Sequence, residues 1–210
     1  MTPRRPDVLA LLCAGAVDLL AGADAALVLG DGLRREDSDP AERAAWIAEH
    51  TTRWQAGWSF WFVVTLTFAW GFYALARHLG GAPQWRHLAV GVALVAAAVD
   101  IVGIVVALAV LPDVTGDPAT FRAAEGLAHG LTAVTAYGLY TVAGLLLLPG
   151  AFATPSYRRL GVVAAVLWGL SALATALLAF DAPGLAPVFA LALLLYAAWA
   201  WASAAWVARH

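Results

Sequence analysis

The chain has 210 residues, of which 62% are hydrophobic and only 12% are charged, and its mean hydropathy is +0.78. An average soluble domain is roughly 45–50% apolar and about 25% charged. Because a fold of this size cannot bury so many apolar side chains, composition excludes an ordinary soluble domain, and it excludes disorder for the same reason. The formal net charge of −2 and the absence of Lys leave no basic surface, so nucleic acid is not expected as a partner. The class that fits is a multi-span membrane protein.

Six apolar segments are long enough to cross a bilayer, which takes about 20 residues. They lie at roughly 8–30, 54–77, 87–111, 123–148, 159–180 and 185–207. Turn-forming and helix-breaking residues separate them, including Pro112 and Pro149, so no proline is expected inside a span. The sequence therefore predicts an all-α fold: residues 1–210 form one bundle of six transmembrane helices that lies in the lipid bilayer.

The distribution of arginine predicts the orientation. With the N-terminus inside, seven arginines fall on the inner side (Arg4, Arg5, Arg77, Arg86, Arg158, Arg159, Arg209) and five on the outer side (Arg34, Arg35, Arg43, Arg53, Arg122). Basic residues concentrate in cytoplasmic loops. We therefore expect a bacterial inner (plasma) membrane protein with both termini in the cytoplasm.

The longest connection carries a helix-start signal. Asp39, Pro40 and Glu42 read as an N-cap, a proline at the first helical position and a capping-box glutamate. This pattern predicts a short interfacial helix in the first outer loop, which would act either as a connector or as a lid.

An internal repeat is one interpretation of the odd-numbered spans. Asp18 precedes Asp31 by 13 residues, and Asp100 precedes Asp113 by 13, whereas Trp168 stands 13 residues before Asp181. Three parallel two-helix repeats would give this spacing, as parallel repeats do in some transporters.

Two aspartates lie near the middle of their spans. A carboxylate at the bilayer centre costs roughly 2.5–3.5 kcal/mol or more unless it is paired or protonated. Small residues line the helix faces that carry Asp18 and Asp100, so each carboxylate should face the bundle interior. They are candidates for a proton or solute site, or for hydrogen bonds that only fix the packing of helices.

The fourth span adds a polar stripe. Glu125, His129, Thr132 and Tyr140 recur at spacings that place them on one helix face, and Asp24 is predicted at a similar depth on the first span. One His with one carboxylate is too little for zinc, which takes three or four protein ligands. We therefore expect a hydrogen bond between His129 and a carboxylate, and neither a metal nor another cofactor.

Four short stretches carry a family resemblance: Arg53-Trp54-Gln55-Ala56-Gly57-Trp58, Val99-Asp100-Ile101-Val102-Gly103, Gly138-Leu139-Tyr140-Thr141-Val142-Ala143-Gly144 and Arg159-Leu160-Gly161. Together they resemble a broad group of small bacterial six-helix membrane proteins that is classified as a domain of unknown function. The resemblance implies six helices and no settled activity, and it supplies no catalytic residues.

These features favour a buried polar site that binds or passes a proton or a small solute, with Asp18, Asp100 and His129 at its centre. We expect these three groups to line one cavity together with Tyr140 or Thr132. An accessory or packing subunit of a larger membrane complex is the first alternative, with another membrane protein as partner. An intramembrane enzyme that uses the same acids is the second.

Overall fold

The computed structural model describes residues 5–33, 39–180 and 185–210. Of the described residues 91% are helical, and none of them lies in a strand. Six stretches are long and apolar enough to cross a membrane: Arg5–Gly32, Thr51–Ala76, Pro83–Asp113, Pro118–Ala153, Pro155–Ala179 and Pro187–Val207. The predicted fold class is confirmed at this level. Arg4, Arg34, Arg35 and the Asp181 of the expected repeat lie outside the described residues.

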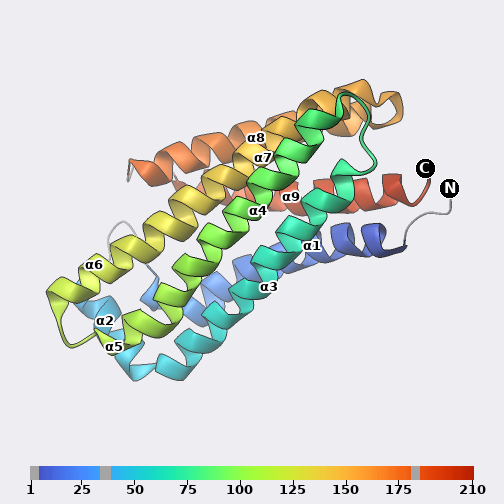
Figure 1. The fold of residues 1–210 in the computed structure, drawn as a ribbon. Coiled ribbons are helices and arrows are strands. Elements are labelled where there is room, and N and C mark those ends of the chain that lie inside the picture. Colours follow the sequence, from blue (N-terminus) through green and yellow to red (C-terminus); the bar gives the residue numbers. More distant parts are fainter. Residues whose placement is uncertain (1–4, 34–38, 181–184) are drawn as a thin grey trace.

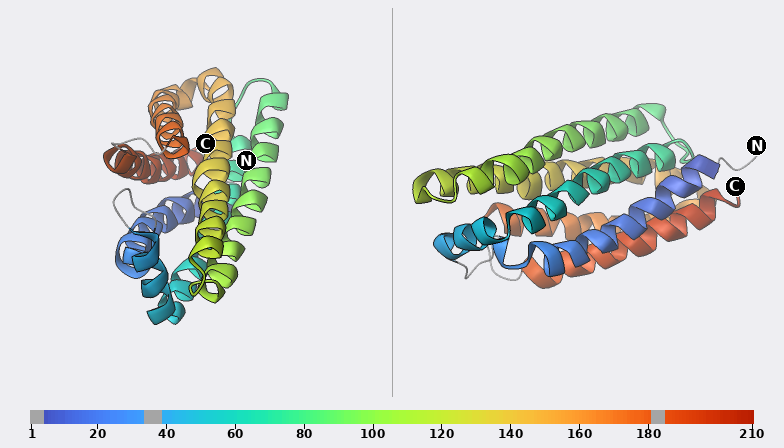
Figure 2. Two further views of the ribbon diagram at one scale, coloured as in Figure 1. Left: turned by 90° about the vertical axis from the view of Figure 1, so that its left-hand side faces the viewer. Right: turned by 90° about the horizontal axis from the view of Figure 1, so that it is seen from below.

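The six stretches form a closed ring. Each packs on two neighbours in the order α1 (Arg5–Asp24), α3 (Thr51–Ala76), α4 (Pro83–Val105), α7 (Tyr137–Ala153), α8 (Arg158–Ala179) and α9 (Leu185–Val207), and α9 returns to α1. Helix α1 begins and α9 ends at one end of the bundle, which we call the terminal end (Figure 1). The short helix α2 (Pro40–Glu49) lies at the opposite end, which we call the α2 end (Figures 1 and 2).

Shorter elements complete the α2 end. Helix α5 (Leu111–Asp113) continues α4, and α6 (Pro118–His129) leads into α7. Asp39 caps α2 and Asp117 caps α6, each accepting a hydrogen bond from the backbone N–H two residues on, with a proline directly after the cap. The hydroxyl of Thr120 and the N–H of Ala119 hold the pKa of Asp117 below its ordinary value.

Three spans also contain π-helical turns: η1 (Ala25–Leu29), η3 (Val106–Val110) and η4 (Gly130–Ala136). Two 3₁₀ turns, η2 (Gly30–Gly32) and η5 (Pro155–Tyr157), complete the elements.

Two expected helix ends are wrong. The spans were predicted to stop before Pro112 and before Pro149, but the helical chain passes through both, and Pro149 lies inside α7. A proline removes one backbone donor and crowds the carbonyl four residues earlier. Transmembrane helices tolerate this loss because neighbouring groups satisfy the freed carbonyl.

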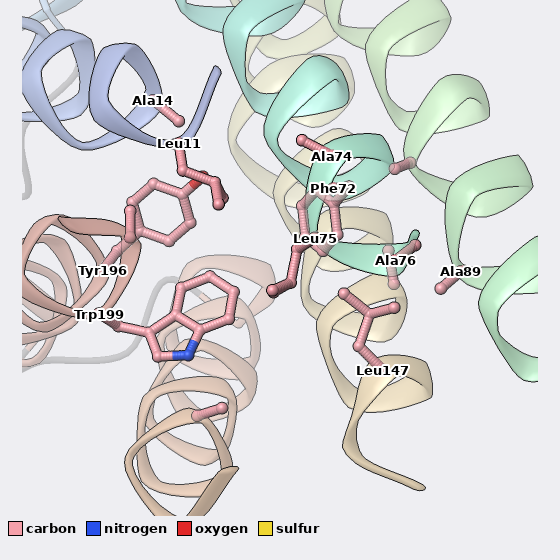
Figure 3. Close-up of a cluster of buried hydrophobic side chains, with 14 of the residues drawn as sticks. Leu11, Ala14, Phe72, Ala74, Leu75, Ala76, Ala89, Leu147, Tyr196 and Trp199 are labelled. Atoms are coloured by element: carbon pink, nitrogen blue, oxygen red, sulfur yellow. The ribbon is translucent and has the colours of Figure 1, made fainter. Parts of the chain in front are cut away.

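The ring encloses an aromatic core. Phe72, Tyr140, Trp168, Tyr196 and Trp199 are all buried and belong to one apolar cluster that reaches every helix of the ring. Figure 3 shows Tyr196 and Trp199 of α9 pointing toward Leu11 of α1 and Leu75 of α3. A second apolar cluster at the α2 end joins α2, α3, η3 and α6. The polar groups described next are therefore set among large apolar side chains.

Candidate functional site

Asp100 is held by a neighbouring helix. Its side chain is buried, and Oδ2 accepts a hydrogen bond of 2.5 Å from the hydroxyl of Thr65 on α3. The hydroxyl of Tyr140 on α7 donates to the backbone carbonyl of Thr65 at 3.4 Å. Asp100 therefore faces the bundle interior, as its small-residue face predicted, and Thr65 links it to Tyr140.

Asp18 is as deeply buried as Asp100 but lacks a comparable hydrogen bond in the part of the chain that the structure describes. Its residue exposure is 8%, the same as that of Asp100, yet Oδ2 has no hydrogen-bond partner among the described residues. Its carboxylate interacts electrostatically with the hydroxyl groups of Tyr137 of α7 and Tyr196 of α9. Asp18 therefore stands in the interior of the bundle without the hydroxyl donor that Asp100 has.

Glycines on either side of Asp18 bring α1 close to α9. A Cβ atom added to Gly15 would lie 2.6 Å from Nε1 of Trp201, and one added to Gly22 would lie 3.0 Å from a methyl carbon of Leu193. Gly15 has no room for a larger residue, whereas at Gly22 the end of the Leu193 side chain would have to shift. Asp18 lies on α1 between these two contacts, so the helices are tightly packed above and below it.

A chain of aromatic ring contacts connects the surroundings of the two aspartates. Phe68 stacks on Tyr196 with 4.5 Å between ring centroids and contacts Tyr140 at 5.4 Å. Tyr196 thus joins the surroundings of Asp18 to the aromatic core, and Tyr140 joins that core to Asp100. No hydrogen bond joins the two carboxylates within the described part of the chain.

Glu125 binds a partner that the sequence did not predict. Its two oxygens accept hydrogen bonds from Nε and one terminal nitrogen of Arg43 on α2, both at 2.6 Å. Both residues are more than nine-tenths buried. This planar, two-point ion pair holds α2 against α6. The carboxylate of Glu125 is therefore used by Arg43, whereas His129 was its expected neighbour.

The other predicted residues lie in separate surroundings. Asp24 is half-buried and accepts a hydrogen bond of 3.1 Å from the indole of Trp61. His129 is half-buried at the end of α6, and the hydroxyl of Thr132 donates to the carbonyl of Ala128 at 3.0 Å. Among the described residues no group of three or more His, Cys, Asp or Glu side chains has the arrangement of a metal site. That Asp18, Asp100 and His129 share one cavity stays a prediction.

A further buried carboxylate, at the terminal end, was missed. Asp7 in the first turn of α1 is 2% exposed and lies 2.9 Å from Nε2 of His78 and 3.4 Å from a terminal nitrogen of Arg77. These contacts tie the beginning of α1 to the end of α3. Asp7 lies just before the first expected span at 8–30, and nothing in the sequence indicated that it would be buried.

Comparison of the sequence with protein-family models, with curated proteins and with solved structures gave no significant match. The functional argument therefore rests on the residues and the contacts described above.

Proposed function

We propose that this chain is a multi-pass membrane protein in which Asp18 takes up and releases a proton within the bilayer. The observation that carries the proposal is the buried Asp18 Oδ2, which has no hydrogen-bond partner among the described residues. An ionised carboxylate in that position is unfavourable by at least roughly 2.5–3.5 kcal/mol. Protonation removes the charge, so we expect the charge state of Asp18 to change whenever a proton can reach it.

The contrast with Asp100 supports this assignment. Thr65 donates a short hydrogen bond to Asp100, which compensates part of the cost of burying that carboxylate. Mid-membrane acids mark proton or ion pathways, and of these two Asp18 is the one without a hydroxyl donor on Oδ2 among the described residues. Asp100 is then the packing group, and Asp18 is the proton-binding group.

A proton fits the surroundings of Asp18 better than an organic solute does. Gly15 and Gly22 allow α9 to approach closely on both sides of the carboxylate. Tyr137 and Tyr196 supply hydroxyl groups nearby, which can exchange hydrogen bonds with a carboxylic acid as well as with a carboxylate. In this proposal both termini are cytoplasmic and the α2 end faces outward, in keeping with the positive-inside rule.

Infrared difference spectroscopy of the protein in lipid vesicles tests the proposal. The C=O stretch of a protonated carboxylic acid is separate from the bands of a carboxylate, so protonation can be followed between acidic and alkaline pH. We expect one such acid band to vanish in Asp18→Asn and to persist in the matched variant Asp100→Asn. Proton flux into vesicles that contain a pH-sensitive dye should fall in the first variant and stay near the unsubstituted level in the second.

Two results would contradict the proposal. The first is a pH-dependent acid band that survives Asp18→Asn. The second is equal proton flux in Asp18→Asn and in the unsubstituted protein, with both correctly folded by circular dichroism.

A further inference from the structure

A proline explains the π-helical turn in the third span. In a regular helix the carbonyl of Leu108 would accept from residue 112, but Pro112 has no N–H, and its ring crowds that carbonyl. The chain adjusts by forming η3, in which the N–H of Leu111 donates to the carbonyl of Val106, five residues earlier. In the π register a carbonyl accepts from the N–H five residues later. For Ala107 that residue is again Pro112, so its carbonyl has no main-chain donor.

A tryptophan from α3 fills this gap. Nε1 of Trp54 donates to the carbonyl of Ala107 at 2.7 Å, and the Trp54 side chain is 2% exposed. The amide of the next residue, Gln55, reaches the carbonyl of Leu108 at 3.5 Å. The indole thus replaces the hydrogen bond that Pro112 removes.

The same turn of α3 also contacts the π-helical turn of the first span. A terminal nitrogen of Arg53 donates to the carbonyl of Leu27 in η1. Three consecutive side chains of α3 therefore bind backbone carbonyls of the two helices that flank it, each within a π-helical turn. They belong to the stretch 53–58, whose role the sequence alone did not indicate.

The two π-helical turns follow the two aspartates. Turn η1 begins seven residues after Asp18 and η3 begins six residues after Asp100. Converting a π turn to α shifts the register beyond it by one residue, which corresponds to about 100° of rotation and 1.5 Å of translation. Such a conversion would turn the α2 end of the helix relative to the part that carries the aspartate.

We infer that Arg53, Trp54 and Gln55 form a clamp that holds η1 and η3 in the π register. Pro112 keeps η3 out of the α register, and Trp54 supplies the donor that makes the π register stable. The clamp thereby fixes the orientation of the α2 ends of α1 and α4 relative to the two aspartates. This inference goes beyond the proton-binding role of Asp18, and its test uses backbone amides rather than the carboxylate.

The test is hydrogen–deuterium exchange of the full-length protein in lipid nanodiscs, followed by mass spectrometry of its peptides. Trp54→Phe keeps the ring and removes the donor, so we expect exchange in peptides over residues 106–113 to rise roughly threefold to tenfold, the loss of one hydrogen bond. Trp58→Phe is the matched control, because Nε1 of Trp58 has no hydrogen-bond partner among the described residues. It should leave exchange in these peptides unchanged.

A second variant separates the clamp from a general loosening of the helix. Pro112→Ala restores the N–H, so the α register becomes available and the Ala107 carbonyl regains a main-chain donor. In that background Trp54→Phe should no longer accelerate exchange over 106–113. The inference is overturned if Trp54→Phe acts equally with and without Pro112, or if Trp58→Phe accelerates exchange as much as Trp54→Phe does.

Discussion

The ion pair between Arg43 and Glu125 makes a quantitative prediction about the α2 end. Both side chains are buried, and two hydrogen bonds of 2.6 Å join them. Breaking such a pair by removing one partner is destabilising, whereas replacing both by apolar residues of similar volume is close to neutral. Glu125→Gln removes the charge that strengthens these two hydrogen bonds, so we expect it to lower the free energy of unfolding by about 1.5–3 kcal/mol. The double variant Arg43→Met/Glu125→Met should regain most of that loss.

The assay is equilibrium unfolding in mixed micelles, with limited proteolysis to follow undocking of α2. Glu42→Gln is the control, since Glu42 lies next to Arg43 on the same helix but is exposed. It should change stability by less than about 0.5 kcal/mol. The reasoning is refuted if Glu125→Gln behaves like this control, or if the losses from Arg43→Met and Glu125→Met simply add in the double variant.

Further substitutions at three positions test the packing of the helices. Thr65→Val removes the donor to Asp100 and keeps the shape of the side chain, so we expect unfolding in mixed micelles to become easier by about 1–3 kcal/mol, with Thr65→Ser nearly unchanged. Gly144→Ala would place a Cβ atom 2.1 Å from the ring of Trp168 and should cost about 1–3 kcal/mol or more. Gly169→Ala meets nothing within 4 Å, so the same assay should show a gain of about 0.5–1 kcal/mol in helix stability.

The helices could be predicted because a membrane span must meet a simple physical requirement. A spanning segment needs about 20 apolar residues and satisfies its own backbone, so hydropathy alone locates it. The ends were less predictable, because a proline normally stops a helix. At Pro112 the outcome depended on a donor from Trp54, more than 50 residues away. Sequence rules that consider near neighbours miss such compensation.

The partner of Glu125 shows the same limit. Residues one turn apart on a helix are neighbours, so the sequence suggested that Glu125 and His129 could share a proton. The partner in the structure is 82 residues away and comes from a helix in the first loop. One signal was present: Arg43 lies four residues before Ile47, so the two share a helix face, and that face is buried. A cation on a buried helix face needs a carboxylate from another element.

The two mid-span aspartates show where sequence reasoning reaches its limit for the function. Both lie on small-residue faces near the centre of a span, and both are 8% exposed. Their burial followed from the cost of a carboxylate in the bilayer, which is the same for both. Their chemistry did not, because it depends on one hydroxyl: Thr65 of the adjacent helix reaches Asp100, and no described residue hydrogen-bonds to Oδ2 of Asp18. A hydrogen bond offsets part of the cost of ionising a buried carboxylate, so the position of Thr65 makes Asp18 the better candidate for the proton-binding group.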